Sequence, residues 1–175
     1  LEIAGSDLFP DNWIYVHSAT LHTGRITNFR NWAPQICGTS PNTILALEYW
    51  ANDDDKLWQM ADTELVALGT REIQQTGLLG RPAASVLNGH VLRVPKSYPI
   101  YKTGYKNELQ LIQPYLDSIN GLHVIGRYGS FKYNNQDHSI LMGMLAAASI
   151  NKSEQQAHWA VNSNYEIYLE KAPAS

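Results

Sequence analysis

Cysteine is nearly absent from this chain: Cys37 is the only cysteine among its 175 residues. A single thiol excludes an internal disulfide bond and any zinc site built from several cysteines. It fits a reducing compartment, so we expect a cytoplasmic protein. Arg30 is the only basic residue close to Cys37 in sequence, and we therefore interpret Cys37 as a part-buried loop thiol rather than a nucleophile.

An excess of positive charge and long apolar runs are also missing. The formal net charge is -3 at pH 7, and the lysines and arginines are scattered, which argues against nucleic acid as a partner. No apolar run approaches the roughly 18 residues of a transmembrane helix, so no membrane span is predicted. No metal site is predicted either, since the acidic turn of residues 52–55 lacks the spacing of a calcium loop.

Two sequence signatures of enzymes are absent. Nowhere does a predicted strand lead into G-x-G-x-x-G and a helix, the pattern that holds the ADP half of a dinucleotide. Gly77, Gly80 and Gly89 have neither that spacing nor that context. The sequence also lacks G-x-S-x-G, which argues against a hydrolase with a serine nucleophile on a strand-to-helix turn.

The residues that are present predict an α+β fold. Alternating or β-branched apolar residues indicate strands, and apolar residues at helical spacing indicate helices. Asp62 is a good residue to cap a helix that ends at Gly77. The predicted strands cover residues 13–16, 25–29, 43–50, 91–94 and 122–125, and the first two are expected to form a hairpin or part of a meander. The predicted helices cover residues 62–76, 107–118 and 137–150, with a further one around residues 153–160.

The most informative stretch runs from residue 122 to residue 150. Residues 122–125 are apolar and partly β-branched, which predicts a buried strand. Gly126 and Gly129 then allow the backbone to turn sharply. Consecutive polar side chains at residues 134–139 precede a strongly apolar helix. The start of that helix offers free N–H groups and a positive dipole end, which favour an anionic or electron-rich ligand.

This stretch carries a family resemblance. The sequence GRYGSFKYNNQDHSI, residues 126–140, resembles the C-terminal flavin-binding segment of a large class of FAD-dependent enzymes. That class includes amine oxidases, protoporphyrinogen oxidases and UDP-galactopyranose mutases. Parts of the substrate domain of the same family resemble residues 11–18, 24–34, 45–50 and 91–101, so the likeness covers roughly residues 8–170.

The resemblance implies FAD as the cofactor and assigns residues to its phosphate end. Gly126 and Arg127 correspond to the end of the strand that meets the FAD pyrophosphate, and Gly129 belongs to the same turn. The planar fork of Arg127 is suited to pairing with a phosphate. A structural role at the strand end is the alternative for Arg127.

The resemblance also assigns residues to the flavin ring. Asn135 and Gln136 correspond to positions that face the ribityl chain and the pyrimidine edge of the flavin. Backbone N–H groups from Gln136 through Asp137 to His138 would hydrogen-bond a flavin carbonyl. His138 is a weak candidate for a catalytic acid or base, and capping is the favoured interpretation. Mutase members have an Asp-Met pair where this chain has Asn135-Gln136, which argues against galactopyranose mutase activity.

Substrate contacts are implied by the same resemblance. The segment of residues 91–101 runs close to the substrate face of the flavin in the family, and large polar or aromatic residues elsewhere in the chain are candidate pocket walls. Trp32 and Trp50 belong to these walls. The residues expected to contact substrate are Lys96, Tyr98, Tyr101, Arg25 and Tyr49.

We therefore expect an α+β chain with three parts. Residues 8–120 would form a substrate-domain-like region with a mixed sheet and packed helices. Residues 121–150 would form the last strand, turn and helix of an FAD-binding domain whose Rossmann half is absent. Residues 151–175 would form a C-terminal helix and tail.

The expected function follows from these parts. The chain begins with Leu1 rather than methionine, and we expect the C-terminal fragment of an amine oxidase-like FAD-dependent oxidoreductase. The whole enzyme would transfer a hydride from a C–N or C–C bond of a small-molecule substrate to flavin, whereas the fragment would be inactive without its partner, the N-terminal dinucleotide-binding half. Two alternatives stay open: a flavin-dependent nucleotide-sugar mutase, and a stand-alone carbohydrate- or partner-binding module.

Overall fold

The computed structural model describes residues 1–80, 82–152 and 158–162. It divides the chain into two compact units, Leu1–Pro95 and a second that begins at Lys96. The predicted boundary between residues 120 and 121 refers to the domains of a parent flavoprotein and stays a prediction. The predicted helix around residues 153–160 lies largely outside the described residues, which include only the short helix η2 (His158–Ala160).

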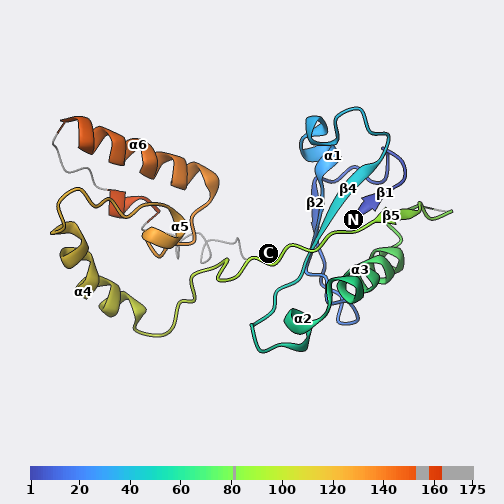
Figure 1. The fold of residues 1–175 in the computed structure, drawn as a ribbon, viewed down its shortest axis with the longest axis horizontal. Coiled ribbons are helices and arrows are strands. Elements are labelled where there is room, and N and C mark those ends of the chain that lie inside the picture. The colour runs from blue at the N-terminus through green and yellow to red at the C-terminus, as the bar shows by residue number, and fades with distance from the viewer. Residues whose placement is uncertain (81, 153–157, 163–175) are drawn as a thin grey trace, which may run out of the picture. The chain divides into compact units, whose positions relative to one another are not determined.

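The first unit contains a five-stranded sheet in the order β2-β3-β4-β1-β5 (Figure 1). Every described pairing is antiparallel, so the predicted mixed sheet is wrong. Strands of parallel sheets are covered on both faces and read as continuous apolar runs, whereas an antiparallel sheet leaves one face in water. The strands are β1 (Glu2–Ile3), β2 (Trp13–Tyr15), β3 (Arg25–Asn28), β4 (Thr43–Glu48) and β5 (Val86–Asn88).

The predicted hairpin is confirmed by the pairing of β2 with β3. Trp13 lies opposite Thr27, and Tyr15 lies opposite Arg25. The side chains of Trp13 and Tyr15 lie on the face of the sheet opposite to that of Ile14, because successive side chains of a strand point to opposite faces. Short helices follow β3, namely α1 (Phe29–Trp32) and η1 (Pro34–Cys37), before the chain returns in β4.

The predicted strand at residues 91–94 is wrong, since the fifth strand is β5, a few residues earlier in the chain. Contacts of the Arg93 side chain hold residues 91–94 in place. Its guanidinium donates to the carbonyl oxygens of Trp58 and Met60, at the end of α2 (Lys56–Gln59), and contacts the carboxylate of Asp62 at 2.5 Å. This segment is therefore held by a helix end rather than by a neighbouring strand.

One face of the sheet is covered by α3 (Asp62–Thr76), the longest helix of the first unit (Figure 1). Asp62 is the first helical residue rather than the cap, and the Glu64 carboxylate accepts the N–H of Ala61 at 3.0 Å. The predicted end is confirmed, because Gly77 adopts the left-handed conformation, with φ of +75°, that glycine tolerates best. The core between sheet and helix consists of Ile3, Phe9, Ile26, Leu45, Ile73 and Leu79.

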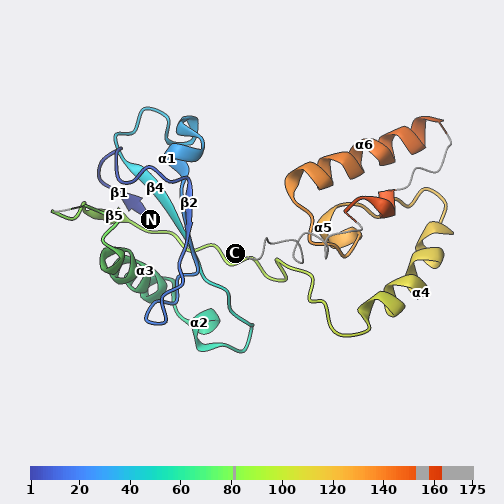
Figure 2. The same cartoon turned by 180° about the vertical axis from the view of Figure 1, so that it is seen from behind.

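The second unit is helical in its described part. It contains α4 (Tyr105–Asp117), α5 (Gly126–Gly129) and α6 (Gln136–Lys152), and both α5 and η2 contact α6 (Figure 2). The predicted helices at residues 107–118 and 137–150 are thus confirmed within a few residues. Among the described residues, no helix combines the length and apolar character needed to cross a membrane.

The predicted strand at residues 122–125 is wrong. Ile125 has an extended backbone, with φ of -131° and ψ of 167°, but no described strand pairs with this segment. A strand needs a neighbour to satisfy its backbone N–H and carbonyl groups. Leu122 and Ile125 are 40% and 36% exposed, so the apolar residues that predicted a buried strand remain partly in water.

Candidate functional site

The start of α6 is the centre of the predicted cofactor site. Gly126 has φ of +77°, a conformation that a side chain would strain, and it begins the short helix that turns the chain toward α6. The N–H of Ser139 donates to the carbonyl oxygen of Asn135 at 3.1 Å. The N–H groups of residues 136–138 precede this first bond of α6, so they have no partner within the helix. Backbone donors therefore collect at an exposed helix end.

His138 caps this helix with its ring. Its Nδ1 atom accepts the N–H of Asn135 at 3.2 Å, and it also lies 3.5 Å from Oδ1 of Asp137. The two contacts compete, because a nitrogen that accepts a hydrogen bond carries no proton to donate. The shorter contact is the hydrogen bond to the backbone, which supports the capping interpretation of the sequence analysis.

Asn134 is the buried anchor of the turn. Its amide nitrogen donates to Ser130 Oγ at 3.3 Å and contacts Met142 Sδ at 3.2 Å, while its oxygen accepts from Asn162 at 3.0 Å. Only 2% of Asn134 is exposed. The sequence alone indicates only that this residue belongs to a polar run. Its burial follows from contacts with residues up to 28 positions away, which no local pattern contains.

The guanidinium of Arg127 is engaged by the protein itself. Its Nε and Nη2 atoms donate to the carbonyl oxygen of Asn134 at 3.0 and 2.7 Å, and Nη1 donates to that of Ser97 at 3.4 Å. The same group lies over the rings of Tyr98 and Tyr133, 5.1 and 4.8 Å from their centroids. Cation–π contacts and bonds to carbonyl oxygens thus hold Arg127 across the turn. Its predicted role at the FAD pyrophosphate stays a prediction.

The tyrosines predicted to contact substrate pack around this arginine. Tyr98 stacks on Tyr133 with the ring centroids 5.2 Å apart, and the hydroxyl of Tyr101 accepts the N–H of Tyr133 at 2.7 Å. The ring of Tyr101 also stacks on Tyr105 at 4.5 Å. Lys96 has a positive φ of 53°, which is uncommon for a residue with a side chain. The second unit therefore brings predicted cofactor and substrate residues into one cluster.

This cluster fits a flavin cofactor through its backbone more than through its side chains. The N–H groups at the start of α6 are able to donate hydrogen bonds to phosphate oxygens or to ring carbonyl oxygens, as N–H groups at helix ends do. Gly126 has open space where a Cβ would stand, so a ligand is able to approach the main chain there. Asp137, 77% exposed in its side chain, adds a negative charge that favours a carbonyl over a phosphate at this helix end.

Two predicted substrate residues lie in the first unit. Arg25 forms a two-pronged ion pair with Glu48, at 2.9 and 2.6 Å, on the sheet face opposite α3. The hydroxyl of Tyr15 accepts a further bond from Arg25 at 3.3 Å. The hydrogen bond to the Glu48 carboxylate raises the pKa of the Arg25 guanidinium, so this side chain is a permanent cation.

Tyr49 belongs to a buried network around Glu72. The Glu72 carboxylate accepts the N–H groups of His22 and Thr23 at 2.7 and 2.9 Å, the Thr23 hydroxyl at 2.5 Å and the Tyr49 hydroxyl at 3.0 Å. Burial raises the pKa of Glu72, but these hydrogen bonds outweigh it and hold the value at about 2. Burial, together with the nearby carboxylate, raises the pKa of Tyr49. Sequence reasoning missed Glu72, because a glutamate within an amphipathic helix normally lies in water.

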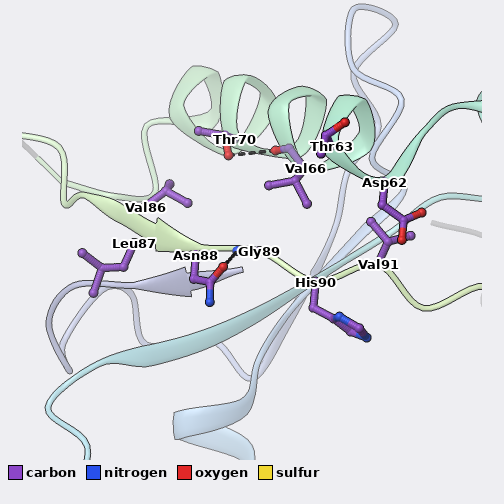
Figure 3. A pocket seen from close by; sticks show the side chains of 10 residues that line it. All are labelled: Asp62, Thr63, Val66, Thr70, Val86, Leu87, Asn88, Gly89, His90 and Val91. Atoms are coloured by element: carbon purple, nitrogen blue, oxygen red, sulfur yellow. Dashed lines mark hydrogen bonds between the residues drawn. The ribbon is translucent and has the colours of Figure 1, made fainter.

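A cavity of about 450 Å³ lies between α3 and β5 (Figure 3). None of the predicted site residues lines it. Gly89 passes so close to Val66 that a Cβ at Gly89 would meet its Cγ1 atom at 2.5 Å. The residues that line the cavity are Asp62, Thr63, Val66, Thr70, Val86, Leu87, Asn88, Gly89, His90 and Val91.

Comparisons with known proteins give a structural likeness for this chain. No family model matches the chain, and no curated protein matches it. Among solved structures, the chain is similar to the crystal structure of reduced UDP-galactopyranose mutase, with a TM-score of 0.75 and 23% sequence identity. This chain has the fold of part of that mutase.

The match spans nearly all of this chain but only part of the mutase. It covers 95% of this chain, so residues of both units take part in it. The chain spans about a third of the mutase's length, 35%. A likeness at this identity concerns the fold, and the chemistry has to be argued from the residues themselves.

Proposed function

We propose that this chain is the C-terminal part of an FAD-dependent enzyme of the UDP-galactopyranose mutase type. The observation that carries the proposal is the shared fold, with its TM-score of 0.75 over 95% of the chain. The sequence resemblance of residues 126–140 supports the same class. Amine oxidase-like and protoporphyrinogen oxidase-like activities rest on that resemblance alone, so the mutase type is the better supported interpretation. A cytoplasmic location is part of the proposal.

FAD would be held chiefly by the backbone at the start of α6. Gly126 and the N–H groups of residues 136–138 would supply the donors, with Asn135 and Gln136 exposed beside them. When bound, FAD supplies a ring that accepts and returns electrons. Arg127 would act by holding the turn through Asn134, and Gly129 leaves the turn compact, since a Cβ there would meet the Val124 backbone at 3.3 Å.

The dinucleotide-binding half of such an enzyme would cover apolar surface of the second unit. Ile125 has an extended backbone, and the side chains of Leu122 and Ile125 are partly exposed, as expected of a segment that would join another sheet. The helix α6 exposes further apolar residues that a globular domain normally covers. These are Ile140, Leu141, Met144 and Ile150, each at least 45% exposed.

The proposed substrate contacts are considered for each unit by itself. Arg25 remains a proposed contact in the first unit, where the Glu48 carboxylate already pairs with its charge, so a substrate would meet an ion pair beside Tyr15. Tyr49 is less accessible, because its hydroxyl is bound to Glu72. Lys96, Tyr98 and Tyr101 remain proposed contacts in the second unit.

The experiment that tests the proposal uses the whole parent protein. Its reading frame upstream of the Leu1 codon should encode a strand, G-x-G-x-x-G and a helix, and the purified protein should carry a flavin spectrum. We expect the reduced holoenzyme to rearrange a nucleotide sugar, with UDP-galactopyranose as a slow substrate because of the Asn135-Gln136 pair, and not to be reduced rapidly by amines. Rapid reduction by amines without rearrangement would establish the oxidase instead.

The Asn135-Gln136 pair allows a sharper comparison. If these residues tune the substrate, Asn135→Asp combined with Gln136→Met should raise rearrangement of UDP-galactopyranose above the parent level. Equal rates in the two proteins would show that the pair does not set the substrate. A start codon adjacent to Leu1 would contradict the enzyme proposal and favour a binding module.

A further inference from the structure

Two tryptophan side chains lie exposed beside each other in the first unit. Trp13 is 47% exposed and Trp32 is 51% exposed, with ring centroids 4.7 Å apart and ring planes tilted by 39°. Tryptophan is a large apolar side chain that is highly buried on average. An adjacent pair that leaves half its surface in water therefore marks a binding surface rather than a packing site.

The pair is held in place by hydrogen bonds of the backbone around it. Trp13 belongs to β2, and Trp32 is the last residue of α1. Asn28 caps α1 by accepting the N–H groups of its first turn, at 3.2 and 3.4 Å. Asn31 then donates to the carbonyl oxygen of Asp11 at 3.2 Å. Since both segments are fixed to each other, the two rings are positioned before any ligand arrives, which lowers the entropy lost on binding.

Two exposed polar side chains adjoin the ring of Trp13. A shallow depression of the surface is lined by Pro10, Asp11, Asn12 and Trp13. Asp11 and Asn12 are exposed, and their side chains make no hydrogen bond within the part of the chain that the structure describes. A carboxylate and a carboxamide thus stand free next to an aromatic surface.

We propose that Trp13, Trp32, Asp11 and Asn12 form a saccharide-binding site. A pyranose ring has one face of C–H groups, which packs on an indole, and an edge of hydroxyls, which a carboxylate and a carboxamide bind as acceptor and donor. The Asp11 charge disfavours a phosphate, and the free polar groups disfavour a purely apolar ligand. The site does not depend on flavin or on the mutase proposal.

The test follows the indole N–H signals of the full 175-residue chain by ¹H–¹⁵N NMR during titration with methyl β-D-galactopyranoside. This sugar has its C–H groups gathered on one face. The chain has five tryptophans, so the three others serve as internal controls. We expect the Trp13 and Trp32 signals to move together and saturate in the roughly millimolar range, as small ligands on open sites do. Sorbitol, which has the hydroxyls but no ring, should leave them unchanged.

Variants test whether the sugar binds at this tryptophan pair or at any exposed tryptophan. Trp32→Phe and Asp11→Asn should each weaken sugar binding about tenfold or more, whereas Trp58→Phe, at a tryptophan of α2 outside the proposed site, should bind the sugar as the parent does. Absence of any shift at Trp13 and Trp32 would overturn the proposal, as would equal shifts at Trp50. Movement of the two signals on dilution of the protein alone would assign the pair to contacts between copies of the chain, and would overturn it too.

Discussion

The hydroxyl of Tyr49 lies 3.0 Å from Oε2 of Glu72, and the hydroxyl of Thr23 lies 2.5 Å from the same oxygen. Both hydroxyl protons are able to point at one carboxylate that is almost entirely buried. The network ties three parts of the first unit together: the segment before β3, the end of β4 and the middle of α3. Glu72 therefore connects the strands that carry Arg25 and Glu48 to the helix that covers them.

Replacing Glu72 should weaken the first unit. Glu72→Gln removes the charge and turns an N–H₂ group toward groups that are themselves donors, so we expect the free energy of unfolding to fall by about 2–3 kcal/mol. Urea unfolding followed by tryptophan fluorescence measures this change. Glu108→Gln, at an exposed position of α4, should change the same quantity by less than about 0.5 kcal/mol. Similar decreases in the free energy of unfolding in the two variants would show that Glu72 does not contribute more than an exposed glutamate.

The same residue predicts a pH dependence of stability. The pKa of Glu72 is lowered from 4.5 in the unfolded chain to about 2 in the folded protein. The carboxylate therefore stabilises the fold fully above the unfolded value, and this stability is lost as the pH falls from about 4.5 toward 2. We expect a loss on the order of 3 kcal/mol over that range. In Glu72→Gln the corresponding step should be absent from a series of urea titrations, and an unchanged step would assign it to other carboxylates.

A side chain at Gly24 should displace the ring of Trp50. A Cβ at Gly24 would meet the Cζ3 atom of Trp50 at 2.1 Å, so Gly24→Ala has to displace the indole. Because Trp50 is 54% exposed, we expect a moderate loss of stability, about 1 kcal/mol, together with a shift of the Trp50 indole signal. Gly143→Ala is the matched control, since a Cβ there meets nothing within 4 Å, and it should stabilise α6 by up to about 1 kcal/mol. An unmoved Trp50 signal in Gly24→Ala would contradict the packing described.

Arg127 should not be replaceable by lysine. A lysine ammonium lacks the planar fork that reaches the Asn134 carbonyl with two N–H groups while stacking on Tyr98 and Tyr133. We expect Arg127→Lys to destabilise the second unit by about 1–2 kcal/mol, visible as a loss of the tyrosine signal in near-ultraviolet circular dichroism at a lower temperature. Arg71→Lys, at an exposed position, should leave that signal unchanged. Equal melting of the parent and Arg127→Lys would mean that the stack contributes nothing.

The chain by itself should not bind FAD tightly. The donors at the start of α6 provide only part of a dinucleotide site, and the G-x-G-x-x-G segment lies nowhere in the sequence. We therefore expect a dissociation constant above roughly 100 µM, measured by the quenching of FAD fluorescence on addition of the 175-residue chain. Stoichiometric binding at micromolar concentrations would contradict this expectation and would call for a complete site within these residues.

Elements whose stability is local could be predicted from the sequence. Residues 13–16 are apolar or aromatic, residues 25–29 alternate in polarity, and the two segments pair as a hairpin. Helix α3 ends at Gly77 as its sequence indicates. Residues 122–125 have the same kind of strand pattern, but a strand exists only when another strand accepts its hydrogen bonds. The sequence pattern therefore predicts the extended backbone of Ile125, but it does not show whether a neighbouring strand is present.

The candidate site shows the same division. The Gly126 turn and the donors at the start of α6 follow from glycine and from helix geometry, and both could be predicted. The partners of Arg127 and Glu72 could not, because they lie up to 30 and 50 positions away in the sequence. The sequence predicts a phosphate contact because a guanidinium is suited to one. In the structure, carbonyl oxygens accept its hydrogen bonds and tyrosine rings lie against its face.

The cap that His138 provides also decides which tautomer its ring adopts. Because a backbone N–H always donates, the bond from Asn135 requires a lone pair on Nδ1, and the neutral imidazole then carries its hydrogen on Nε2. The ring thus offers a donor to its surroundings. In this tautomer Nε2 of His138 is able to donate a hydrogen bond, whereas Nδ1 takes up a proton only if the hydrogen bond from the Asn135 N–H at the start of α6 breaks.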